Sequence, residues 1–330
     1  MAAAPGALSG LPAARRIPSS RQAPPCGAMA PSRKNLHGQQ SARSARRSGH
    51  VVRAAESNSG GGGQSWLQVL CPFLKMFSGG DPAEARPRWL EVTTSGLASI
   101  TRMPYGTSAG DASRNRASDP AQPLQLYEFE ACPFCRRVRE AVTDLDLTVD
   151  VYPCPKDAIR NRAEVLSRGG KSMFPYLIDP NTGKEMYESA EIVQYLYDTY
   201  GAGAQVPEGL VNSTLRTGWM PTLLRIGRGL VRYENAEREA PEKLLELYNY
   251  ENNQFARLVR EALCELELPY RLISAGKGSK NRNKLEEESG KTTVPYLVDP
   301  NKGVKMAESD QIVDYLFKNY SRQPVGQSAS

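Results

Sequence analysis

The feature that most constrains the fold is a duplication within the chain. Residues 124–142 and 245–263 share an apolar strand-like run followed by the helical pattern Val-Arg-Glu-Ala. Further along, residues 174–181 (FPYLIDPN) match residues 294–301 (VPYLVDPN). The offset of about 120 residues is too long for a solenoid repeat and fits a duplicated domain. A chain of 330 residues can hold two such units, each with its own core.

Each copy shows the same series of local patterns. The series predicts strand, helix, strand, helix, strand, strand and helix, with the Asp-Pro-Asn turn joining the last two strands as a hairpin. Ser189 and Ser309 stand where helix N-caps belong, and each follows a glutamate. The expected fold class is therefore α/β (α+β), with two tandem thioredoxin-like domains that each combine a mixed sheet and flanking helices.

The first copy carries Cys132-Pro-Phe-Cys135 between its first strand and first helix. Two thiols at this spacing and place indicate a thioredoxin-like redox site. The helix N-terminus stabilises the thiolate of Cys132, and Cys135 lies one turn on, within reach of a mixed disulfide. Glu128 and Glu130 precede the motif, and their negative charge is expected to oppose thiolate formation.

The second copy has lost the thiols. Asn253 and Ala256 occupy the positions of Cys132 and Cys135, so activity is expected from the first copy only. Pro295 and Glu308-Ser309 remain, and they leave two possibilities open: binding of the same ligand as the first copy, or a purely architectural role.

Composition excludes several other kinds of chemistry. His37 and His50 are the only histidines and both precede residue 56, which removes Ser-His and Cys-His hydrolysis from the body of the chain. A second C-x-x-C is missing, so no metal site is expected. The first 55 residues contain nine of the 42 Lys and Arg and none of the 36 Asp and Glu. The remainder therefore has a net charge of −3, and nucleic-acid binding is not expected.

The leader has the composition of a transit peptide. Residues 1–55 are rich in Ala, Arg, Ser and Pro, and Val52-Arg53-Ala54-Ala55 resembles a chloroplast processing site. We expect a chloroplast location, in the stroma; a mitochondrial presequence and a disordered basic tail are the alternatives. A short amphipathic segment at 66–77 is expected to pack against the body or to lie on a membrane surface. No apolar run is long enough to span a bilayer.

These patterns divide the chain into six parts. The divisions are a transit peptide (1–55), a largely irregular N-terminal segment with one helical patch near its end (56–120), the first domain (121–203), an ordered connector (204–242), the second domain (243–321) and a tail (322–330).

Three motifs of the first copy carry a family resemblance. Cys132-Pro-Phe-Cys135, Phe174-Pro175 and Glu188-Ser189, in this order, resemble the glutaredoxin-like N-terminal domain of glutathione S-transferases. The tandem arrangement over about residues 121–321 resembles plant plastid proteins with two such domains.

The resemblance implies a glutathione site. Pro175 is expected to be a cis-proline that leaves the backbone of Phe174 free to pair with the cysteinyl part of glutathione. Glu188 and Ser189 are expected to bind the γ-glutamyl ammonium and carboxylate. Arg136, or its neighbour Arg137, is expected to act on the thiolate or on the glycyl carboxylate. Cys132 is implied as the attacking thiolate, and Cys135 as the resolving or stabilising thiol.

The function implied is that of a glutathione-dependent thiol–disulfide oxidoreductase. Glutathione would be its reductant and disulfide-containing or glutathionylated proteins its partners. The alternative is a non-catalytic glutathione-binding or interaction module. Conjugating transferase activity is less expected, because in transferases an all-helical domain follows, whereas here a second thioredoxin-like domain does.

Overall fold

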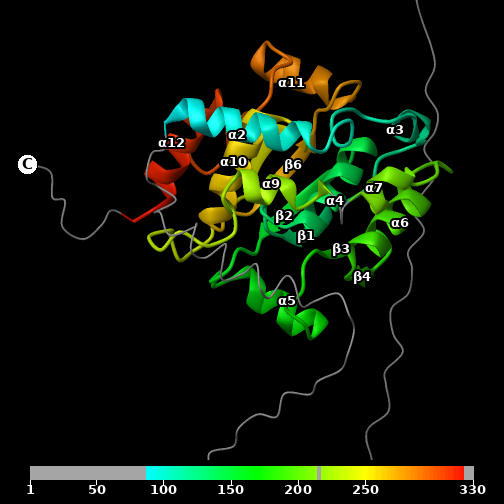
Figure 1. Cartoon of the computed structure of the whole chain (residues 1–330), viewed down its shortest axis with the longest axis horizontal. Coiled ribbons are helices and arrows are strands. Elements are labelled where there is room, and N and C mark those ends of the chain that lie inside the picture. The colour runs from blue at the N-terminus through cyan, green and yellow to red at the C-terminus, as the bar shows by residue number, and fades with distance from the viewer. Residues whose placement is uncertain (1–86, 214–216, 323–330) are drawn as a thin grey trace, which may run out of the picture. The chain divides into compact units, whose positions relative to one another are not determined.

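The computed structural model describes residues 87–213 and 217–322 (Figure 1). The leader 1–55, the amphipathic segment 66–77 and all but the first residue of the tail lie outside the described residues. Within the described part, no helix combines the length and the apolar character needed to cross a membrane.

The two copies fold into the same series of elements, which confirms the predicted fold class. The first copy contains β1 (Leu124–Glu128), α4 (Pro133–Asp144), β2 (Thr148–Pro153), α5 (Asn161–Gly169), β3 (Tyr176–Asp179), β4 (Lys184–Met186) and α6 (Ser189–Tyr200). The second contains β5 (Leu245–Asn249), α10 (Gln254–Glu265), β6 (Tyr270–Ser274), α11 (Asn281–Ser289), β7 (Tyr296–Asp299), β8 (Val304–Ala307) and α12 (Ser309–Tyr320).

The eight strands form one continuous sheet in the order β4-β3-β1-β2-β6-β5-β7-β8. Within each copy the first two strands are parallel, the third pairs antiparallel with the first, and the fourth pairs antiparallel with the third. The copies meet where β2 pairs antiparallel with β6, from Thr148 opposite Ile273 to Val151 opposite Tyr270. Each copy thus covers the edge strand that the other would otherwise expose.

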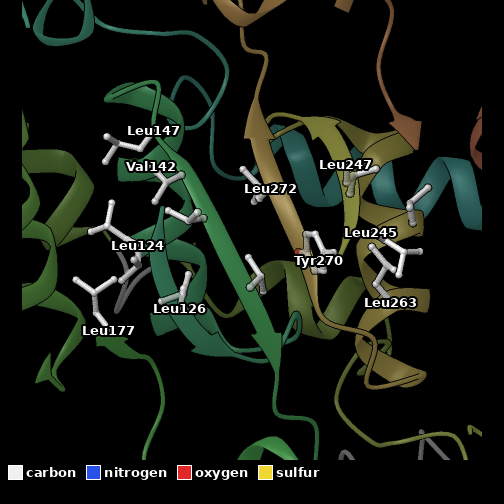
Figure 2. Close-up of a cluster of buried hydrophobic side chains, with 14 of the residues drawn as sticks. Leu124, Leu126, Val142, Leu147, Leu177, Leu245, Leu247, Leu263, Tyr270 and Leu272 are labelled. Atoms are coloured by element: carbon white, nitrogen blue, oxygen red, sulfur yellow. The ribbon is translucent and has the colours of Figure 1, made fainter. Parts of the chain in front are cut away.

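The junction between β2 and β6 is apolar on one face and charged on the other. Val149, Val151, Tyr270 and Leu272 are buried in a single hydrophobic core that takes residues from both copies (Figure 2). On the opposite face, Arg271 donates to Asp150 at 2.7 and 3.1 Å. The two copies therefore share one hydrophobic core and are not packed as two separate domains.

One buried carboxylate per copy ties the hairpin turn to the last helix. Asp179 accepts hydrogen bonds from Tyr195 and Tyr200, each at 2.5 Å. In the second copy Asp299 accepts from Tyr315 and Tyr320 at 2.7 and 2.5 Å. Burial by itself raises the pKa of both carboxyls, but these phenol donors bring it below the ordinary value. The repeated Asp-Pro-Asn motif is thus a fold determinant.

In the described residues, four helices lie outside the repeat. α2 (Arg88–Ile100) covers the stretch where a helical patch is expected and packs on α10 and on α9 (Met220–Leu224), as Figure 1 shows. α7 (Glu208–Asn212) packs on α4, and α3 (Asp111–Asn115) precedes β1. The segments before and between the copies therefore cover the first helix of each copy.

Candidate functional site

Cys132 lies at the N-cap of α4, directly before Pro133. Its Sγ accepts a hydrogen bond from the backbone N–H of Cys135 at 3.3 Å, and its side chain is almost fully buried. A sulfur at this place faces the unpaired N–H groups at the start of the helix. The geometry therefore suits Cys132 as the nucleophile of the pair.

Cys135 has a different environment. It is fully buried, and burial raises the pKa of its thiol well above the ordinary range, with the adjacent Cys132 sulfur and the Glu128 carboxylate acting in the same direction. Cys135 is thus held as a neutral thiol next to the Cys132 sulfur, where it can stabilise a negative charge.

The cis-proline loop lies beside the dithiol loop. The Phe174–Pro175 peptide bond is cis, and Phe174 packs edge-on against Phe129, whose carbonyl accepts from the N–H of Cys132 at 3.0 Å. The guanidinium of Arg162 lies 4.8 Å from the centre of the Phe174 ring. Arg162 is held there because its Nε donates to the carbonyls of Cys154 and Pro155.

Glu188 and Ser189 form the start of α6. Glu188 is exposed and has a positive φ of 65°, while Ser189 is buried. Arg137 of α4 donates to the Ser189 hydroxyl at 3.2 Å and to the carbonyl of Val211 at 2.8 Å. Arg137 therefore connects the helix that carries the thiols to the Glu-Ser motif.

Arg136 points in another direction. It donates to Glu140 at 3.1 Å and, across the junction between the copies, to Asn252 at 2.9 Å. Contacts thus connect Phe174 to the dithiol loop through Phe129 and connect Ser189 to α4 through Arg137, whereas Arg136 is directed toward the second copy. Sequence reasoning did not find Arg162, because nothing in its local pattern distinguishes it from a solvated arginine at a helix start.

The acidic residues before the motif are neutralised within the fold. Arg260 of α10 donates to both carboxylate oxygens of Glu130 at 3.0 Å, and Arg139 of α4 pairs with Glu128. Arg139 in turn donates to Glu251 of the second copy at 2.8 Å. The negative charge of Glu130 is therefore paired across the junction with an arginine of the second copy.

The connector between the copies covers the dithiol loop. Thr222 donates to the carbonyl of Ala131, and the N–H of Ala131 faces the carbonyl of Gly229 at 3.5 Å. Gly229 has a positive φ of 73°, and a Cβ there would come within 2.7 Å of the Glu130 Cβ. Cys132, which follows this covered stretch, is 4% exposed.

The second copy repeats the site without the thiols. Asn253 caps α10 by accepting from the N–H groups of Phe255 and Ala256 at 2.9 and 2.8 Å, and Val294–Pro295 is cis. A cavity of about 270 Å³ lies here, lined by Arg88, Phe255, Thr293, Val294, Pro295, Ala307, Glu308 and Ser309. No group of His, Cys, Asp and Glu that could hold a metal ion occurs in residues 87–213 and 217–322.

Comparison with known proteins finds one family and a few solved structures. Residues 126–205 and 247–324 each match the family described as glutathione S-transferase, N-terminal domain. No curated protein sequence matches the chain.

Among solved structures, two of the Bombyx mori glutathione transferase BmGSTD1, one of them in complex with GTT, share 27% identity with this chain at a TM-score of 0.23. They cover 26% of this chain, which spans only 38% and 39% of theirs. Leishmania TDR1, a trimeric glutathione transferase, shares 16% identity at a TM-score of 0.25, covering 63% of this chain and 70% of its own.

Proposed function

Because the chain carries two tandem domains of the glutathione S-transferase N-terminal type, we propose that the first is a glutathione-dependent thiol–disulfide oxidoreductase site. The observation that carries the proposal is the environment of the two thiols. Cys132 has its sulfur at a helix N-terminus and accepts an N–H there, whereas Cys135 is buried with a raised pKa.

The proposed reaction is two thiol–disulfide exchanges. The Cys132 thiolate attacks the glutathione sulfur of a mixed disulfide, which forms a Cys132–glutathione disulfide and releases the other thiolate. A second thiolate then attacks the glutathione sulfur, regenerates the Cys132 thiolate and leaves with the glutathione as a disulfide. Cys135 remains a thiol throughout and stabilises the charge on the Cys132 sulfur.

Glutathione would lie along the cis-proline loop. The backbone of Phe174 before Pro175 is available for strand-like pairing with its cysteinyl residue. The start of α6 at Glu188 and Ser189 provides a carboxylate for the ammonium group and helix N–H groups for the γ-glutamyl carboxylate. Arg162, stacked on Phe174, is the cation best placed for the glycyl carboxylate.

The test is glutathione-coupled reduction of a small glutathione mixed disulfide. Wild type is compared with Cys132→Ser and Cys135→Ser, and with Cys264→Ser as a matched control for a buried thiol of the second copy. We expect Cys132→Ser to be inactive, Cys135→Ser to retain most of the rate and Cys264→Ser to match wild type. Activity that depends on Cys135 as strongly as on Cys132 would contradict the monothiol reaction.

One observation favours the second candidate function, a glutathione-binding module without turnover. Cys132 is 4% exposed under the connector, which restricts access of a second substrate. Glutathione binding by calorimetry together with no turnover in wild type would support this module and refute the oxidoreductase.

The plastid location belongs to the same proposal and rests on the composition of residues 1–55. A fluorescent protein fused after residue 55 should enter chloroplasts. Import into mitochondria instead would contradict it.

A further inference from the structure

A small pocket lies beside Cys132 on the side that faces the second copy. Its lining includes Cys132, Pro133 and Arg136 of the first copy, Thr222 of the connector, and Arg257 and Glu261 of α10. The free space of about 10 Å³ admits one water-sized group. Pro175, Glu188 and Ser189 are not part of this lining, so the pocket is separate from the proposed course of glutathione.

Two buried guanidinium nitrogens in this lining have no hydrogen-bond acceptor. They are Nη1 of Arg136 and Nε of Arg257, on side chains that are each 2% exposed. The other polar contacts of Arg136 are with Glu140, Asn252 and Glu251. Nη2 of Arg257 donates to the hydroxyl of Ser99 at 3.1 Å. A buried N–H donor without an acceptor costs free energy. The pocket therefore suits a ligand that brings a hydrogen-bond acceptor.

The pocket wall also places two arginines, Arg136 and Arg257, close enough to repel each other. Its two carboxylates are already paired, Glu130 with Arg260 at 3.0 Å and Glu261 with Arg225 at 2.7 Å. No carboxylate of the described residues lies within ion-pair distance of Arg257. Burial and the charge of Arg136 lower the pKa of Arg257 to about 9. A bound water would satisfy the N–H groups, but only an anion would also relieve this repulsion.

We propose that the pocket binds a carboxylate oxygen of the small thiol that regenerates Cys132. The inference rests on the proposed function of Cys132. A guanidinium binds a carboxylate with charge-assisted hydrogen bonds, and the pocket wall includes the reacting cysteine itself. The cover that the connector places over Cys132 favours a small thiol over a protein.

The test compares two alkylating reagents of similar size at Cys132 in the full-length protein. Iodoacetate carries a carboxylate next to the reacting carbon, and iodoacetamide carries a neutral amide there. Peptide mass spectrometry gives the rate constant of each reagent at Cys132, and their ratio is divided by the same ratio for free cysteine. We expect this normalised ratio to fall about tenfold in Arg257→Gln, because one buried charge near the reagent is removed.

Two further variants and one fold measurement make the result interpretable. Arg257→Lys keeps the charge and should restore part of the preference. Arg271→Gln removes an arginine of β6 that does not line the pocket and should keep the wild-type ratio. Thermal unfolding checks that each variant is folded. If Arg257→Gln is unfolded, the comparison of Arg257→Lys with wild type tests the proposal. The normalised ratio should then fall at least twofold, because lysine lacks the forked guanidinium donors.

Two results overturn the proposal. The first is a folded Arg257→Gln variant with the wild-type iodoacetate-to-iodoacetamide ratio. Any preference for iodoacetate would then come from the helix N-terminus and not from Arg257. The second is a Cys132 that neither reagent alkylates. Alkylation does not require glutathione, so a normal Arg257-dependent ratio in a protein without glutathione turnover would refute the proposed function and leave the pocket intact.

Discussion

Replacing Glu128 by Gln should remove a dependence of stability on pH that the fold imposes. Glu128 ends β1, is 2% exposed and is paired with Arg139. Burial raises the pKa of its carboxyl to about 7, although Arg139 acts in the opposite direction. The second copy has Asn249 at the same place, buried and accepting from Arg260 at 3.3 Å, which shows that a neutral amide fits the site.

The sign and size of the effect follow from this pKa. A carboxyl that binds its proton more tightly in the folded state makes the protein less stable as the pH rises from the unfolded pKa, about 4.5, through the folded pKa of about 7. Between pH 5 and pH 8 Glu128 should therefore reduce the free energy of unfolding by about 2 to 3 kcal/mol. For a folded part of this size, that corresponds to roughly 5–10 °C in Tm.

The assay is urea unfolding at pH 5, 6, 7 and 8, followed by tryptophan fluorescence. The difference in unfolding free energy between Glu128→Gln and wild type should grow in favour of the variant as the pH rises. Asn249→Glu is the matched control, since it places a second acid at the equivalent position and should steepen the fall with pH. If the difference between Glu128→Gln and wild type is the same at all four pH values, Glu128 is ionised against Arg139 throughout and the reasoning is refuted.

Three further predictions concern the junction, the turn and the glutathione site. Glu251→Gln removes a buried carboxylate that pairs with Arg139 and Arg260, so the free energy of unfolding should fall by about 3–5 kcal/mol in urea titrations; a loss below about 1 kcal/mol would contradict this. Asp179→Asn weakens two phenol hydrogen bonds and should cost about 2 kcal/mol, and Asp299→Asn should cost the same within about 1 kcal/mol because its contacts are equivalent; a large difference between the two would show that the copies do not share stability. Arg162→Gln should weaken glutathione binding to the first copy about tenfold, as measured by calorimetry. Arg282→Gln, its counterpart in the second copy, should leave that affinity unchanged. Equal effects of the two variants would show that Arg162 does not bind the glycyl carboxylate.

The local features of the site follow from the sequence because they depend on neighbours along the chain. A cysteine before Pro133 and a helical pattern is placed at an N-cap by backbone geometry alone, and the repeated Asp-Pro-Asn turn fixes each hairpin in the same way. The duplication itself predicts two copies of one thioredoxin-like fold, because equal patterns of apolar residues bury equal faces.

What only the tertiary structure decides is how the copies meet. The sequence predicts both β2 and β6 as strands. No local pattern predicts that these two strands pair with each other. That pairing brings α4 and α10 together, so that Arg260 neutralises Glu130 and Arg257 reaches the pocket beside Cys132. Charged groups about 130 residues apart along the chain thus become neighbours at the dithiol loop, and their distances are set by packing, which no sequence pattern contains.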